Sequence, residues 1–132
     1  MDTRCNPVTR MNDELQLWIR QQLDAAVLGF IKTELFEDAL IEVKPAWTLP
    51  LKILIGKVRE QSNPTTFRWF ICGEVPLDHV GAEVAISPRD VIRHFAMKWQ
   101  LDSEALQSGD ATTLIEHAQS LYPLADDDRL WG

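Results

Sequence analysis

Apolar side chains occupy both faces of a period-two pattern between residues 51 and 72, and this pattern constrains the fold most strongly. Two segments, 51–59 and 66–72, carry it, and each is expected to be a strand. In the first segment, one face has Ile53 and Ile55 and the other has Leu54 and Val58. In the second segment, one face has Phe67, Trp69 and Ile71 and the other has Arg68, Phe70 and Cys72. Such a sheet needs a cover on both faces, either from helices or from a second subunit.

A helical pattern precedes these strands. Asn12 is a good N-cap, and apolar residues with the spacing of one helix face follow it. We expect Gly29 to kink or split this long helix. Residues 1–11, interrupted by Pro7, are predicted to be a flexible lead-in. The apolar stripe consists of Leu15, Trp18, Ile19, Leu23, Ala26 and Phe30.

The other segments complete an α+β domain. Pro45 places the strand expected at 43–49 on a sheet edge, and short links between successive strands favour an antiparallel meander. Ser87-Pro88 is a typical helix start, and Gly109-Asp110 predicts the start of a last helix. The sequence thus predicts one α+β domain over residues 12–132, with a long N-terminal helix, a three-stranded antiparallel sheet and two to three C-terminal helices.

Size and charge narrow the functional classes. The chain has 132 residues, the size of one domain, and a net charge of −7 from 13 basic and 20 acidic residues. Nucleic acid is therefore not expected as the main partner. No apolar run follows Met1–Arg4 or approaches the length of a membrane span, so we expect a cytoplasmic protein without membrane contact. The two cysteines, Cys5 and Cys72, do not form a disulfide framework.

Common catalytic signatures are absent from the sequence, which has no phosphate loop, dinucleotide-binding glycine motif, nucleophile elbow or zinc-protease motif. Its three histidines lack ligand spacing, so no metal and no cofactor is expected. The loop at 73–80 is the first candidate site. Glu74, Asp78 and His79 could form an acid/base group there, with Cys72 as a nucleophile. A buried structural role for Cys72 is the favoured interpretation.

Arg89 and Arg93 form the second part of this candidate site. They are one turn apart on the helix that starts at Ser87, and like charges at that spacing favour a nearby anion. That anion is either a small anionic ligand held between the loop at 73–80 and the helix start, or an acid of the protein itself, such as Glu74 or Asp78. We favour the internal ion pair.

A contact surface is the other candidate feature. Trp47, on the expected edge strand, belongs to a residue type that is enriched at interaction hot spots. Leu54, Val58 and Phe70 share one sheet face, which predicts either a homodimer or a cover from the C-terminal helices. The dimer is slightly favoured.

Several segments together resemble a family of small bacterial proteins described as a domain of unknown function, over roughly residues 12–122. The matching segments are Trp47-Thr48-Leu49-Pro50, Gly73-Glu74-Val75-Pro76-Leu77-Asp78-His79, and Pro88-Arg89-Asp90 with His94-Phe95 and Trp99. The family's loop more often has Asp and Thr where this chain has Glu74 and Leu77. The resemblance implies a bacterial cytosolic origin and an α+β fold, and it implies no mechanism.

Three functions remain open. The leading hypothesis is a non-catalytic protein-interaction module that binds a partner protein or itself. The second is a small-molecule binder or enzyme with its site at the loop 73–80 and the helix start at 88. The third is an acidic immunity or inhibitor-type protein that masks a basic partner through charge complementarity.

Overall fold

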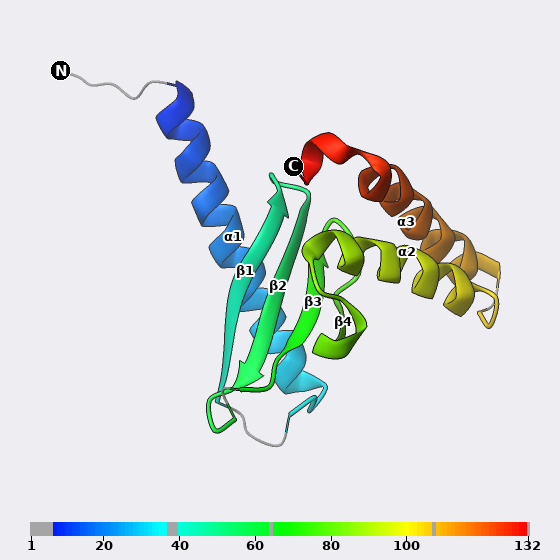
Figure 1. Ribbon diagram of the computed structural model, residues 1–132, viewed down its shortest axis with the longest axis horizontal. Helices are drawn as coiled ribbons and strands as arrows, with labels where there is room; N and C mark the ends of the chain where they lie inside the picture. Colours follow the sequence, from blue (N-terminus) through cyan, green and yellow to red (C-terminus); the bar gives the residue numbers. More distant parts are fainter. Residues whose placement is uncertain (1–6, 37–39, 64, 107, 132) are drawn as a thin grey trace. The chain divides into compact units, whose positions relative to one another are not determined.

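The computed structural model describes residues 7–36, 40–63, 65–106 and 108–131 (Figure 1). Their contacts divide the chain into two compact units, Met1–His79 and Val80–Gly132. The elements are α1 (Pro7–Lys32), β1 (Ile41–Leu49), β2 (Ile53–Glu60), β3 (Arg68–Gly73), β4 (Asp78–Gly81), the 3-10 helix η1 (Ala82–Val84), α2 (Pro88–Ser103), α3 (Ser108–Asp126) and the 3-10 helix η2 (Asp128–Leu130). The predicted α+β class is confirmed.

The sheet has four strands in the order β1-β2-β3-β4, so the predicted three-stranded sheet was one strand short. Both β1–β2 and β2–β3 are antiparallel. The predicted edge position of the strand around Pro45 is confirmed, and the register shifts between Pro45 and Trp47. A bulge at this point suits proline, which cannot donate a hydrogen bond to the ladder.

Helix α1 covers one face of the first unit's sheet and runs behind β1 and β2 in Figure 1. Its stripe supplies two buried residues, Ala26 and Phe30, and these join the sheet residues Leu54, Val58, Phe70 and Cys72 in one core. Trp18, Ile19 and Leu23 pack against the same core. The face predicted to meet a second subunit or the C-terminal helices is therefore the face that α1 covers.

Helix α1 differs from the prediction at its start and at Gly29. The helix already begins at Pro7, so the last residues of the expected lead-in 1–11 are helical. Proline is well suited to a first helical turn because it has no backbone N–H, and N–H groups in that turn have no acceptor within the helix. Residues 1–6 lie outside the described part. The helix also continues through Gly29 to Lys32. Gly29 leaves space for Leu77, whose Cδ2 would lie 2.6 Å from a Cβ at this position.

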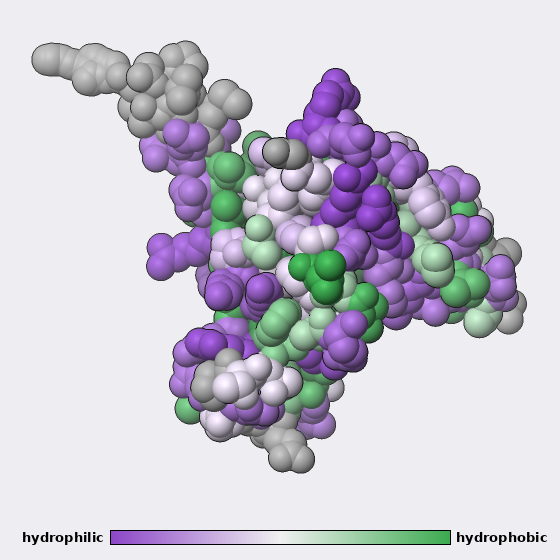
Figure 2. All heavy atoms as spheres, in the orientation of Figure 1, coloured by the Kyte–Doolittle hydropathy of each residue, from purple (hydrophilic) through white to green (hydrophobic). Residues whose placement is uncertain are grey.

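The second unit is built on α2 and α3. The predicted cap of α2 is confirmed, since the Ser87 hydroxyl accepts a hydrogen bond from the Asp90 N–H at 3.3 Å. Helix α3 starts at Ser108, two residues before the predicted Asp110. The visible surface of both helices is mostly hydrophilic (Figure 2). Among the described residues, no helix combines the length and apolar character that crossing a membrane requires.

Candidate functional site

Two successive cross-strand pairs of charged residues mark the sheet face that points away from α1. Glu42 on β1 lies opposite Arg59 on β2, and Lys44 lies opposite Lys57. Directly opposite residues have Cβ atoms about 5 Å apart, so opposite charges attract and like charges repel at this distance. The first pair is therefore favourable, whereas the second is unfavourable without an anion.

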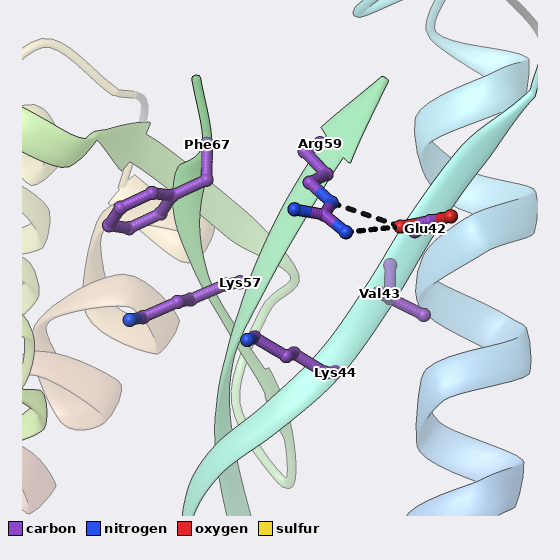
Figure 3. A pocket seen from close by; sticks show the side chains of 6 residues that line it. All are labelled: Glu42, Val43, Lys44, Lys57, Arg59 and Phe67. Carbon is purple, nitrogen blue, oxygen red and sulfur yellow. Dashed lines mark hydrogen bonds and ion pairs between the residues drawn. The ribbon is translucent and has the colours of Figure 1, made fainter. Parts of the chain in front are cut away.

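The Glu42–Arg59 pair is satisfied internally. Arg59 Nε lies 2.9 Å and Nη2 2.8 Å from the same Glu42 oxygen, Oε2. The third guanidinium nitrogen points away from Glu42 in Figure 3. The two side chains are 42 % and 47 % exposed, and an ion pair with this exposure contributes little to stability, about 0–1 kcal/mol.

Lys57 is held by aromatic rings. Its ammonium lies 4.6 Å from the ring centroid of Phe67 and 5.0 Å from that of Trp69. Each such contact is worth about 0.5–1 kcal/mol at an exposed site. The two rings meet edge to face at 5.5 Å. The rings restrict the rotamers of Lys57, so this side chain loses less conformational entropy when an anion binds.

These side chains enclose a small open hollow, which we call the lysine hollow. Its volume is about 170 Å³, and it is lined by Glu42, Val43, Lys44, Lys57, Arg59 and Phe67. Lys44 and Lys57 both extend to the side on which Phe67 lies (Figure 3). Three cations and one carboxylate line the hollow, although the whole chain carries a net charge of −7. The arrangement can hold an anionic group beside an aromatic wall.

The predicted loop residues are engaged in local structure. The Glu74 N–H donates to the Lys52 carbonyl at 2.7 Å, and the Glu74 side chain is exposed. Asp78 accepts a hydrogen bond from the N–H of the next residue at 2.8 Å. His79 Nδ1 accepts a hydrogen bond from Arg68 Nε at 3.0 Å, and its ring packs edge to face on Phe30. These contacts hold the turn into β4 in place.

Arg89 and Arg93 belong to the second unit and pair with acids of that unit. Arg89 donates from Nε to the Ala125 carbonyl at 2.7 Å and from Nη2 to Asp128 at 2.6 Å. Arg93 Nη1 lies 3.5 Å from Asp90. Internal pairing is thus present, but the acids are Asp128 and Asp90 instead of the suggested Glu74 or Asp78. Arg89 ties the end of α3 and η2 to the start of α2.

Cys72 is a buried core residue, as the favoured interpretation of the sequence has it. Only 5 % of it is exposed, and burial raises the pKa of its thiol to about 12. The thiolate is the reactive form of cysteine, so a raised pKa disfavours nucleophilic attack by this thiol near neutral pH. Within the described ranges, no three His, Cys, Asp or Glu side chains gather where they could hold a metal ion.

Three of the predicted interface residues are inaccessible. Leu54, Val58 and Phe70 have no exposed surface, because α1 packs over them. Trp47 is half-buried and lies opposite Ile55, on the sheet face that carries the lysine hollow. Of the four, only Trp47 could contact a partner.

Sequence reasoning missed the residues of the lysine hollow because each charge looks ordinary by itself. The available signal was Lys57, a charge within an apolar strand. Its pairing with Lys44 depends on the register of β1 against β2, and the bulge between Pro45 and Trp47 shifts that register. A shift of one residue turns side chains to the opposite face. Which charged residues lie together can therefore be determined only when the register of β1 against β2 is known.

Comparison with known proteins agrees with the resemblance seen in the sequence. The model of one family, described as domain of unknown function DUF4826, matches residues 12–131. The chain belongs to this family. No curated protein and no solved structure matches it.

Proposed function

We propose that this DUF4826 protein is a non-catalytic interaction module that binds an acidic group of a partner protein in the lysine hollow. The like-charged cross-strand pair Lys44–Lys57 carries the proposal. Among the described residues, the structure gives neither ammonium a carboxylate partner. The repulsion between the two ammonium groups destabilises the free protein, and a bound anion would offset it. This offset would favour partner binding.

The dimensions of the hollow support a contact with a partner's side chain. Ligand pockets that enclose a whole small molecule usually hold about 300–1,000 Å³, whereas this hollow holds about 170 Å³ and is open to the surface. It has room for the head group of one side chain. The absence of common catalytic motifs from the sequence and the un-ionised Cys72 thiol also favour binding over catalysis.

Charge reversal at Lys44 tests the proposal. The probe is a fluorescent peptide with two adjacent glutamates, and the readout is its anisotropy at low salt. Lys44→Glu should weaken binding about tenfold or more, because a charge-assisted contact is replaced by repulsion. The variant should still be folded, and about 0.2–1 kcal/mol more stable, because the introduced carboxylate would lie opposite Lys57.

Lys32→Glu is the matched control, since it makes the same charge reversal at an exposed lysine at the end of α1. This variant should bind the peptide like the parent protein. If Lys44→Glu and Lys32→Glu have the same effect on binding, the peptide senses only net charge and the lysine hollow is not the site. Higher salt should weaken the specific contact, because ions screen exposed charges.

A further inference from the structure

The charge balance of the lysine hollow indicates how much negative charge its occupant carries. The Glu42 carboxylate and the Arg59 guanidinium compensate each other in a direct ion pair. The ammonium groups of Lys44 and Lys57 remain, and together they present two positive charges. A single carboxylate would leave one of them uncompensated, whereas a phosphate monoester, with a charge of about −1.5 to −2 at pH 7, would balance both.

The donors that remain in the hollow also favour phosphate. The planar fork of arginine matches a carboxylate, and in this protein Glu42 already occupies it. Lysine instead presents a compact point charge with three donors, which suits the three outer oxygens of a phosphate group. Glu42 thus occupies the guanidinium of Arg59, which would otherwise suit a carboxylate of the ligand. Lys44 and Lys57 are the donors that remain for the ligand.

The shape of the hollow indicates what carries the phosphate. Its volume of about 170 Å³ suits a head group, and Phe67 offers an apolar wall to the short stem behind it. We infer that the lysine hollow binds a phosphorylated side chain of a partner protein. This inference rests on the function proposed above and specifies the chemistry of the group that is bound.

A comparison of two matched peptides tests the inference. One carries phosphoserine and the other glutamate at the same position, and both are titrated against the full chain by fluorescence anisotropy. The phosphoserine peptide should bind about tenfold more tightly, because it adds at least one charge-assisted hydrogen bond. Equal affinities would overturn the phosphate assignment.

The variant Glu42→Gln measures the charge of the bound group. Glutamine keeps an oxygen that can accept from Arg59 but removes a negative charge from the wall of the hollow. Coulomb energy is proportional to the product of the charges, so the gain in log affinity should be about twice as large for a dianion as for a monoanion. A gain of about threefold for the glutamate peptide would correspond to about tenfold for the phosphoserine peptide. Equal gains would contradict a dianion in the hollow.

The outcomes separate the inference from the proposed function. If Lys44→Glu weakens neither peptide, the hollow binds no acidic group and the proposed function fails. If it weakens both peptides but they bind equally well, the function stands and the phosphate assignment fails. Inorganic phosphate provides the third arm. If it binds as tightly as the phosphoserine peptide, the occupant is a free anion and not a partner's side chain.

Discussion

Cys72 gives the clearest consequence at the scale of one residue. Its thiol pKa is raised from 9.0 to about 12 by burial, so above pH 9 the unfolded thiol loses its proton while the folded one keeps it. The free energy of unfolding should therefore fall between pH 9 and 12, by about 2 kcal/mol at about pH 10.5. Urea unfolding of the parent and of Cys72→Ala at several pH values checks this.

The Cys72→Ala variant should lack this fall and otherwise follow the parent, since the remaining ionisable groups are shared. Cys5, which lies outside the described residues, is present in both proteins and cancels in the comparison. Parallel pH profiles for the two proteins would show that the Cys72 thiol already ionises in the folded state, contrary to its burial.

Single residues also show where sequence reasoning succeeds and where it stops. The cap at Ser87 and the burial of Cys72 follow from local patterns, and both are confirmed. The partner of Arg89 does not follow from such patterns, because Asp128 lies 39 residues further along the chain. An ion pair across that separation depends on how α2 and α3 pack, so no local sequence motif predicts it.

At the scale of an element, the C-terminus of α1 is strained. The Leu35 N–H donates to the Phe30 carbonyl at 3.2 Å and the Glu34 N–H to the Ile31 carbonyl at 3.1 Å, the two bonds of a Schellman motif. Glu34 has a φ of 55° there, where glycine is favoured. Glu34→Gly should raise the free energy of unfolding by about 0.5–1 kcal/mol, as measured by urea denaturation.

Gln21→Gly is the control for this substitution. It places glycine on the exposed face in the middle of α1 and should cost about 1 kcal/mol. A loss of stability in both variants would mean that Glu34 makes a contact worth more than its backbone strain.

The elements themselves were predictable where their pattern is long. The expected strands at 51–59 and 66–72 correspond to β2 and β3 with the predicted faces. Strand β4 was missed because Asp78–Gly81 has only four residues, too few for an alternation to be recognised.

At the scale of the whole molecule, the sequence predicted that both sheet faces would be covered but not which cover lies on which face. Ile55 and Ile71 on one face are as apolar and as fully buried as Leu54 and Phe70 on the other. Hydrophobicity therefore cannot distinguish the two faces. The structure makes the assignment, because Ala26 and Phe30 of α1 share one core with Leu54 and Phe70.

The burial of Leu54 leads to a prediction about self-association. Because its side chain lies in the core beneath α1, Leu54→Ala should lower the free energy of unfolding by about 2–5 kcal/mol and leave the sedimentation coefficient unchanged at micromolar concentration. Trp47→Ala is the matched comparison, since Trp47 is half-buried on the other face. If the chain forms a homodimer through its accessible sheet surface, Trp47→Ala should weaken the dimer and Leu54→Ala should not. A dimer that dissociates on Leu54→Ala, with the unfolding midpoint unchanged, would mean that α1 does not cover this face in solution.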